Sequence, residues 1–458
     1  MRSASSCHPP LRGRAPLVPR RRTTAAARAA SATAKTAREA SCRLGRRKDR
    51  PHLVLPATPG RLHALGRRPC NYHVLGMQSP LRLADLSETT RGVLPSQLLA
   101  EAVGAGWVDA GPGLPPGNIQ PASLDLRLGP AAYRLRCSFL PGEKTVEEKL
   151  QQLVVDELDL RQDGAVLETG RPYLVPLVES LRLPKFVRAK ANPKSSTGRL
   201  DVFCRLVTDG SFRFDEVANG YQGPLWLEVV PLSFAVRARQ GLSLNQLRLM
   251  VGRARLDDYE VRELHERSPI VYIDGRPALQ HELALDEGLF LSVDLLRGAH
   301  QGVGYRAREH TFALDLAELG QHPAERYWEK ALPEDEGRMV LAPERFYLLL
   351  SREAVSVPPE LACEMTAYDP TSGELRAHYA GFFDPGFGYD QAGHLKGSRA
   401  ALEVRAHDVP FLVEHGQRVC RLTFEHMAAP PDKLYGDDIG SNYQGQEGTL
   451  SKHFKKPD

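Results

Sequence analysis

The chain has 458 residues, 42% of them hydrophobic, and a formal net charge of +4, which is enough sequence for two domains of ordinary size. Residues 1–76 hold 15 Arg and 2 Lys against one Glu and one Asp, a net charge of +15, so residues 77–458 carry −11. An acidic body argues against a broad nucleic-acid surface. Because no run of about 18 apolar residues occurs, no transmembrane helix and no membrane partner are expected.

The basic segment 1–76 is rich in Arg, Ala, Pro and Ser and has few large apolar residues, so we expect no fold of its own. It has three interpretations: a targeting peptide, a nucleic-acid-binding tail, or translated sequence upstream of a true start at Met77. The third is favoured, because a patterned globular sequence begins soon after Met77.

The body contains four cysteines that stand singly within apolar stretches: Cys137, Cys204, Cys363 and Cys420. This spacing predicts buried, reduced thiols rather than a disulfide framework. Reduced thiols are typical of the cytoplasm, which is the expected location.

Helix signals are few, and they predict short helices over residues 95–103 and 146–155. Segments such as 225–230 and 400–405 are short, apolar-rich and bounded by Gly and Pro, as strands are. Many short strands with frequent turns predict a mainly β fold, with a barrel or sandwich in each half.

Three blocks recur in the same order. Residues 123–129 match 292–298, residues 173–175 match 347–349, and residues 227–229 match 402–404. Chance recurrence explains any one match but hardly all three at a nearly constant offset, so the body is interpreted as a duplicated domain. The predicted boundaries are a first domain at 77–255, a linker at 256–284, a second domain at 285–430 and a tail at 431–458.

Several catalytic classes lack their sequence signatures. Cys-x-x-Cys and His-x-Glu are both absent, which argues against a zinc nucleobase deaminase and against zinc as a cofactor. A phosphate loop, a dinucleotide-binding glycine fingerprint and a nucleophile elbow are absent too.

The turn at 194–199 places two cations, Lys194 and Arg199, around three hydroxyls and a glycine. Such a set suits the oxygens of a polyphosphate. From this hexamer alone, a solvated loop is the more common outcome.

Glu403 is an acid inside an apolar strand pattern, and Glu228 is its counterpart in the first repeat. A carboxylate in such a place should have a raised pKa and could take and return protons, although an outward-facing, solvated Glu is more common. The turn before it contains Asp384, which either bonds its own turn or accepts a sugar hydroxyl. The polar, Gly-rich residues 434–446 are either an arm that closes over a ligand or a disordered end.

These segments together resemble the dCTP deaminase family. Residues 119–129 resemble the start of that family, and 194–199 are similar to its Arg-Ser-Ser-x-x-Arg turn, with Lys194 in place of the first Arg. Residues 380–387 with Glu403 resemble its Asp-Pro-Gly turn and catalytic glutamate, and residues 435–446 resemble its nucleotide-clamping end. The matches cover most of 95–458. The duplication departs from the usual single copy and resembles a longer, fused bacterial form.

The resemblance implies duplicated dUTPase-like β-barrels or jelly rolls with a few short helices, and active sites between neighbouring barrels. It also implies a homo-oligomer or a pseudo-trimeric assembly. Repeat one keeps the Ser-Ser-x-x-Arg turn, whereas the matching residues 369–373 lack the Arg; repeat two keeps the Asp-Pro-Gly turn and the tail. We therefore expect one composite site, with Glu228 structural or vestigial.

The implied reaction is the zinc-independent hydrolysis of dCTP to dUTP and ammonia. The dUTP would supply thymidylate synthesis. Glu403 would move protons, while Ser195 and Arg199 would hold the water and Arg199 would keep Glu403 ionised. The substrate-binding residues implied are Lys194, Ser196, Ala380, Gly381, Asp384, Tyr435, Asn442, Tyr443 and Gln446, with Mg²⁺ carried on the triphosphate. Two alternatives remain: a dUTP diphosphatase, alone or joined to the deaminase, and a non-catalytic nucleotide-binding module.

Overall fold

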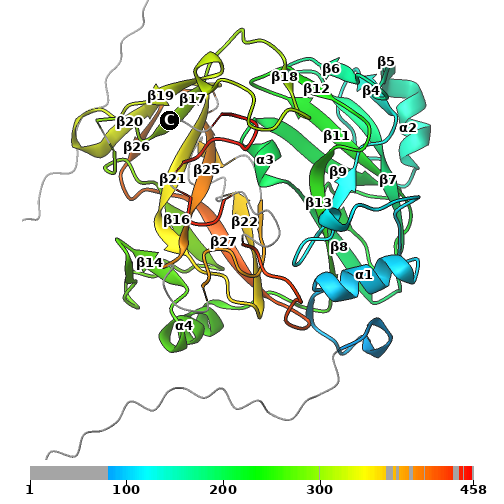
Figure 1. The fold of residues 1–458 in the computed structure, drawn as a ribbon, viewed down its shortest axis with the longest axis horizontal. Coiled ribbons are helices and arrows are strands. Elements are labelled where there is room, and N and C mark those ends of the chain that lie inside the picture. Colours follow the sequence, from blue (N-terminus) through cyan, green and yellow to red (C-terminus); the bar gives the residue numbers. More distant parts are fainter. Residues whose placement is uncertain are drawn as a thin grey trace, which may run out of the picture. The chain divides into compact units, whose positions relative to one another are not determined.

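The computed structural model describes residues 81–298, 300–367, 375–377, 381–390, 396–406, 408–436, 443–446 and 448–455. Residues 1–76, for which no fold of their own is expected, lie outside the described residues. The described chain is mainly β with a few short helices, as predicted (Figure 1). None of its helices is long and apolar enough to cross a membrane.

Both helices predicted from the sequence are confirmed within two residues. Among the described residues the α-helices are α1 (Ser96–Gly104), α2 (Val146–Leu153), α3 (Ser195–Gly198) and α4 (Asp258–Arg267), and the short 3-10 helices are Leu83–Asp85, Pro116–Asn118, Ala324–Arg326 and Asp335–Gly337. Reciprocal capping boxes start α2 and α4, where a side chain accepts from a backbone N–H three residues on and the acid there accepts in return.

The strands fall into two series. The first series is β1 (Gly92–Val93), β2 (Val108–Asp109), β3 (Leu124–Arg127), β4 (Ala131–Leu135), β5 (Val154–Asp159), β6 (Ala165–Leu167), β7 (Tyr173–Arg182), β8 (Val187–Pro193), β9 (Val202–Thr208), β10 (Glu216–Val217), β11 (Gln222–Pro231), β12 (Val236–Ala238) and β13 (Ser243–Val251). The second series is β14 (Val271–Ile273), β15 (Arg276–Pro277), β16 (Leu289–Ser292), β17 (Gly304–Ala307), β18 (Leu314–Asp315), β19 (Trp328–Ala331), β20 (Arg338–Leu341), β21 (Phe346–Val355), β22 (Leu361–Ala367), β23 (Leu375–Ala377), β24 (Gly381–Phe383), β25 (Ser398–Ala406), β26 (Phe411–Glu414) and β27 (Arg418–His426).

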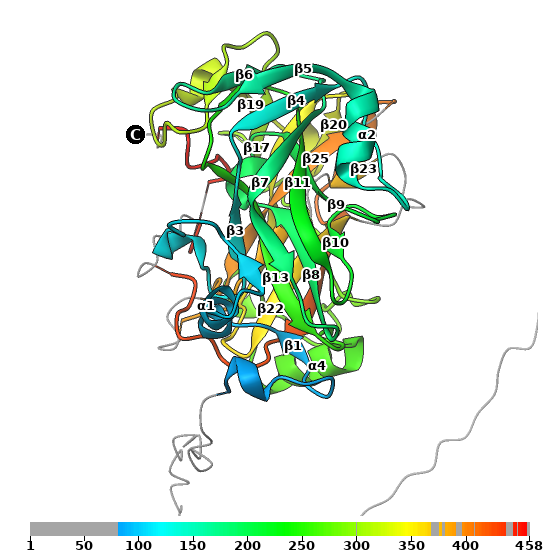
Figure 2. The ribbon, with the colours of Figure 1, turned by 90° about the vertical axis from the view of Figure 1, so that its right-hand side faces the viewer.

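The two series repeat the same pairings. Strand β11 lies between β7 and β9, and β25 lies between β21 and β23; β13 pairs with β3 and β8, and β27 pairs with β16 and β22. The registers also correspond, because Glu228 faces Leu174 while Glu403 faces Leu348. In Figure 2 the long strands β7, β11, β13 and β8 of the first half face the viewer.

The two halves share part of their core. The buried ring of Phe234, from the first half, packs edge-on against Tyr327 and Trp328 of the second, with centroids 5.5 and 5.2 Å away. Phe454, near the C-terminus, joins the same cluster, and β12 pairs in parallel with β18. The halves are therefore held together by buried apolar surface as well as by chain connectivity.

Residues 256–284, predicted as a linker, are structured and pack with the second half. Helix α4 buries Val261, and β14 pairs with β21 and buries Val271 and Ile273. The boundary between the halves therefore lies close to the start of α4. The prediction of buried thiols holds for three cysteines, but Cys137 is exposed, because it follows β4 in a loop.

Candidate active site

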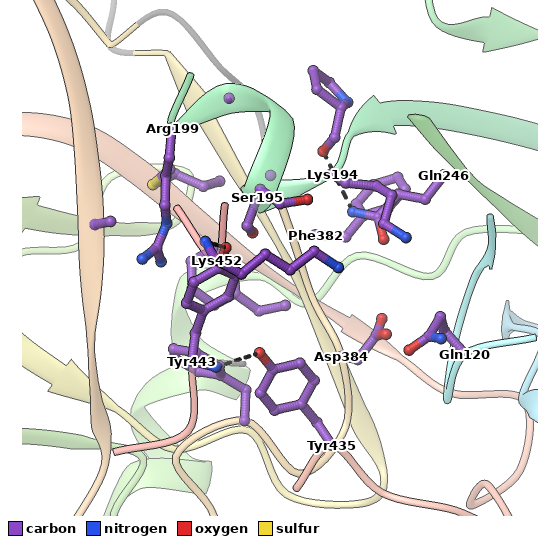
Figure 3. Close-up of a pocket in the computed structure, with 18 of the residues that line it drawn as sticks. Gln120, Lys194, Ser195, Arg199, Gln246, Phe382, Asp384, Tyr435, Tyr443 and Lys452 are labelled. Carbon is purple, nitrogen blue, oxygen red and sulfur yellow. Dashed lines mark hydrogen bonds between the residues drawn. The ribbon is translucent and has the colours of Figure 1, made fainter. Parts of the chain in front are cut away.

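A cavity of about 280 Å³ lies between the two halves, and both halves contribute to its lining (Figure 3). The first half contributes Gly117, Gln120, Asp125, Pro193, Lys194, Ser195, Ser196, Gly198, Arg199 and Gln246. The second half and tail contribute Met365, Gly381, Phe382, Phe383, Asp384, Phe387, Ala401, Glu403, Tyr435, Tyr443, Gln446 and Lys452. The predicted site residues that the structure describes thus meet in one cavity, while Ala380, Asn442 and residues 369–373 lie outside the described residues.

The turn at 194–199 is a single helical turn against the cavity rather than a solvated loop. Strand β8 ends at Pro193, Lys194 caps α3, and backbone bonds from Thr197 and Gly198 to the Lys194 carbonyl close the turn. Ser195 is half-buried, whereas Ser196 and Arg199 are buried. The chain therefore presents one hydroxyl and one guanidinium to the cavity from a fixed backbone.

Glu403, on β25, packs directly against α3. It is buried, and a methyl group at Gly198 would lie only 2.6 Å from its Oε2 atom. From the sequence, Gly198 was expected to let the backbone come close to phosphate. In the structure, its lack of a side chain lets the Glu403 carboxyl group come close to the turn. Repeat one supplies the small residue and repeat two the acid, so their juxtaposition joins the two halves.

Burial raises the pKa of Glu403 to about 8; Arg199 lowers this pKa and Asp201 raises it further. Arg199 therefore favours the ionised form of Glu403, as expected, but less strongly than burial disfavours it. Loss of hydration outweighs one cation, and the carboxyl group is mostly neutral at pH 7. A group that titrates near neutral pH can both give and take a proton.

Arg199 fastens the tail over the cavity. Its Nη1 donates to Oε1 of Gln446 at 2.8 Å and to the Thr449 carbonyl at 3.3 Å, and its Cζ lies 3.7 Å from the centre of the Tyr443 ring. The Tyr443 N–H in turn donates to the Tyr435 hydroxyl at 3.2 Å (Figure 3). The segments 443–446 and 448–455 thus form an ordered cover on the cavity.

The Asp-Pro-Gly turn forms the opposite wall. Asp384 is buried, and burial raises the pKa of its carboxyl group while the adjacent Arg248 lowers it. Gly386 has φ +101°, and a Cβ there would lie 2.6 Å from the Tyr435 nitrogen, so only glycine lets the tail pass this close. The turn and the start of the tail are consequently one packed unit.

Sequence reasoning missed several lining residues. Asp125 forms an ion pair with Lys194, and burial raises the pKa of Asp125. Lys452 reaches into the cavity between Ser195 and Asp384 (Figure 3), and its ammonium makes no ion pair with any described residue. Asp125 lies inside the opening block 119–129 and could have been singled out there, whereas no local pattern marks Lys452.

Comparison with known proteins identifies the family. Residues 90–253 match the family model "2'-deoxycytidine 5'-triphosphate deaminase (DCD) N-terminal domain", and residues 257–454 match the C-terminal domain of the same description. The chain belongs to the dCTP deaminase family.

The crystal structure of a 2'-deoxycytidine 5'-triphosphate deaminase from Agrobacterium tumefaciens is 47% identical, with a TM-score of 0.68, and the match covers 74% of this chain and 99% of that one. A Halobacterium salinarum protein named "dCTP deaminase, dUMP-forming" is 31% identical over 135 residues, which are 29% of this chain and 64% of that relative. A Haloarcula marismortui "dCTP deaminase" is 31% identical over 126 residues, 27% of this chain and 60% of the relative. The chain thus covers less than two thirds of the length of these two curated relatives.

Glu228, the first-half counterpart of Glu403 in this member of the dCTP deaminase family, has different surroundings. Its Oε2 accepts from Nη2 of Arg205 at 2.6 Å and from the Ser138 hydroxyl at 3.2 Å, all within the first half. Arg205 also stacks on Phe214, with 3.7 Å between its Cζ and the ring centre. An acid that is paired in this way holds its own sheet together and is not positioned for proton transfer.

Proposed function

We propose that this chain hydrolyses dCTP to dUTP and ammonia in the composite cavity. The observation that carries the proposal is the buried Glu403 carboxyl group, packed on the α3 turn beside Ser195 and Arg199. The family match and the solved Agrobacterium tumefaciens deaminase support it.

In the proposed step, the Glu403 carboxylate takes a proton from a water held by Ser195 and Arg199, and the hydroxide adds to C4 of cytosine. Glu403 passes that proton to N3, giving a tetrahedral intermediate. A second proton, from the new hydroxyl group, moves by way of Glu403 to the amino group. Ammonia leaves, the C4 carbonyl forms, and the protons balance. Such acid–base catalysis contributes roughly 10²–10⁴-fold, so the fixed positions of base, water and ring must supply the rest.

The remaining lining residues would bind different parts of the nucleotide. Lys194 and Lys452 place two cations on the cavity for the triphosphate, with Ser196, Tyr435, Tyr443 and Gln446 beside them. Mg²⁺ would arrive on the phosphates as part of the substrate. Asp384 and the backbone from Gly381 would hold the sugar and the base edge.

The proposed function goes with a particular type of β domain and a particular assembly. The repeated strand pairings support two dUTPase-like barrels or jelly rolls, the second of which would include residues 256–284. A homo-oligomeric or pseudo-trimeric assembly and a cytoplasmic location stay predictions.

A product assay tests the proposal. The full chain is incubated with dCTP and Mg²⁺, and ammonia, dUTP, dUMP and diphosphate are quantified. Ammonia matched by dUTP supports the deaminase. Ammonia with dUMP and diphosphate points to the combined reaction that the name of the Halobacterium salinarum relative describes. Nucleotide binding without any product would instead favour a binding module and overturn the proposal.

A further inference from the structure

Arg248, on β13 of the first half, is the largest fully buried side chain of the described residues, with 0% of its surface exposed. It stands in the otherwise apolar strand sequence of residues 247–251. Taking a guanidinium group out of water costs several kcal/mol unless good partners replace the water. A buried arginine therefore needs acceptors for its N–H groups, and here the second half supplies four of them to Nη1 and Nη2, while Nε has no partner among the described residues.

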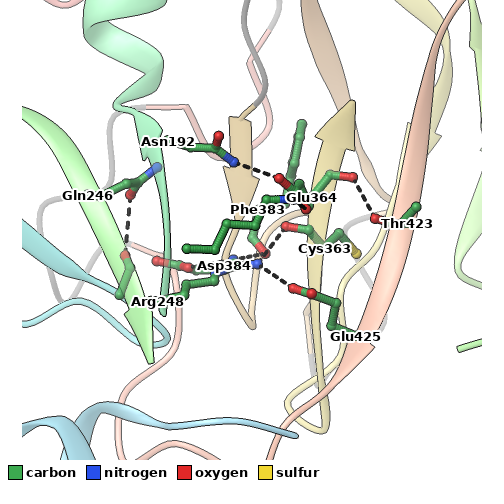
Figure 4. A network of polar contacts seen from close by, with 11 residues as sticks. Asn192, Gln246, Arg248, Cys363, Glu364, Phe383, Asp384, Thr423 and Glu425 are labelled. Carbon is green, nitrogen blue, oxygen red and sulfur yellow. Dashed lines mark hydrogen bonds and ion pairs between the residues drawn. The ribbon is translucent and has the colours of Figure 1, made fainter. Parts of the chain in front are cut away.

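The acceptors all belong to the wall that carries the Asp-Pro-Gly turn (Figure 4). Nη2 donates to the Phe383 carbonyl and to Oδ1 of Asp384, both at 3.0 Å. Nη1 donates to the Cys363 carbonyl at 2.9 Å and to Oε2 of Glu425 at 3.1 Å. The guanidinium also stacks on the Phe382 ring, with its Cζ 4.0 Å from the ring centre. Arg248 thus fixes three consecutive lining residues of the cavity, 382–384, without lining it.

The corresponding position in the other half shows that this contact has no equivalent. Arg248 faces Lys190 in the β13–β8 register, and Thr423 faces Glu364 in the β27–β22 register, so Thr423 is the counterpart of Arg248. Thr423 donates only to the Glu364 carbonyl, at 3.2 Å. The half that lacks the Asp-Pro-Gly turn thus supplies the arginine that holds it, and the half that has the turn has no such arginine.

We infer that Arg248 is a positioning residue that sets the sugar end of the cavity and, through Asp384 and Phe382, the preference for deoxyribose over ribose. The inference rests on the proposed function. Arg248 occupies Oδ1 of Asp384, so the carboxylate has one orientation and offers Oδ2 to a ligand. Excluding an extra 2′-hydroxyl group requires a wall that cannot recede, and a guanidinium that bonds four acceptors at once keeps this wall in place.

The test compares two neutralised pairs in the full chain. R248M/E425Q removes the arginine together with one of its acids, so that Glu425 is not left as an unpaired buried charge. K190M/E364Q removes another ion pair between the halves, Lys190 to Glu364 at 2.6 Å, which does not line the cavity and does not include Arg248, although Glu364 faces Phe382 in the β22–β24 register. For R248M/E425Q we expect kcat/KM with dCTP to fall about 10- to 100-fold, mostly through KM, and the preference for dCTP over CTP to fall about tenfold. K190M/E364Q should keep the wild-type preference.

R248K keeps the charge but not the planar fork, and it serves if the double variant fails to fold; it should show part of the same loss of preference. A folded R248M/E425Q or R248K protein with the wild-type preference overturns the inference, and so does an equal loss in K190M/E364Q. If the wild-type chain shows no turnover, the proposed function fails. Dissociation constants for dCTP and CTP measured by calorimetry on the same variants then still decide the role of Arg248.

Discussion

At the residue scale, the proposed role of Glu403 requires a carboxyl group that is buried and still able to exchange protons. Its apolar strand and the Gly198 backbone remove water, which raises its pKa to about 8, and Arg199 lowers this pKa only in part. Glu228 has the same position in its sheet but is paired with Arg205. One strand position thus serves two purposes because its neighbours differ.

The pKa of Glu403 predicts the pH dependence of the reaction. The base form has to be present to accept the water proton, so kcat/KM for dCTP should rise about tenfold per pH unit below pH 8 and level off above it. Steady-state rates from pH 6 to 9.5 check this. E403Q should lose at least about 100-fold in kcat, whereas E228Q should keep the wild-type profile. A flat profile, or an E403Q protein with full turnover, would contradict the role of Glu403.

Lys452 carries the second prediction at this scale. Burial and the nearby Lys194 lower the pKa of Lys452. A bound anion would stabilise the charged form of this ammonium group. K452M should raise KM for dCTP about 10- to 100-fold, the range of one lost hydrogen bond to a charged group, and change kcat less. K455M, which alters an exposed lysine of the same segment, is the control. Equal KM values for the two variants would remove Lys452 from the phosphate site.

At the element scale, α3 has only four residues, and its position depends on what packs against it. Arg199 follows it and bonds Gln446 and Thr449, Ser196 accepts from the Ser451 hydroxyl at 2.8 Å, and Gly198 contacts Glu403. The turn therefore connects β25, the strand that carries Glu403, to the tail.

G198A tests that connection. The backbone of Gly198 is helical, so alanine fits the main chain, but its methyl group would collide with the Glu403 carboxyl group. We expect kcat to fall about 100-fold while the thermal midpoint changes by only a few degrees, because a displacement of about 1 Å is enough to misplace the base. In G104A, a helical glycine of α1 with open space around it, activity should be unchanged. If G198A retains full activity, the close packing of α3 on Glu403 is not required for catalysis.

At the scale of the whole molecule, the sequence predicted the class of the fold and the pairing of the repeats, because strand motifs and turn residues are local patterns. It also placed the turn at 194–199 and Glu403 in one composite site, because each repeat had visibly lost what the other kept. Contacts between distant segments were not predictable. Arg248 is a lone cation in an apolar strand, but the sequence does not show which distant groups accept its hydrogen bonds, and nothing near Lys452 marks it as a cavity residue. The segment 256–284 was predicted as a linker, although Asp257 and Glu260 stand in the capping-box pattern that starts the ten-residue α4.

The shared core predicts that the two halves unfold together. Phe234 of the first half is fully buried against Tyr327 and Trp328 of the second, and Arg405 of β25 pairs with Asp201 of the first half. F234A should cost about 3–5 kcal/mol of unfolding free energy, the usual range for a buried Phe. Because the halves share this core, the lost stability of F234A should appear as a single unfolding transition at a lower temperature.

Scanning calorimetry of the full chain measures this, with dCTP binding followed across the same temperature range. F212A, which removes a first-half phenylalanine that is 69% exposed, is the matched control and should leave the midpoint within a few degrees of wild type. Two separate transitions in F234A, with one half still folded after the other has melted, would mean that the halves are independent domains. Nucleotide binding should then be lost at the first transition, because neither half alone supplies both the α3 turn and Glu403.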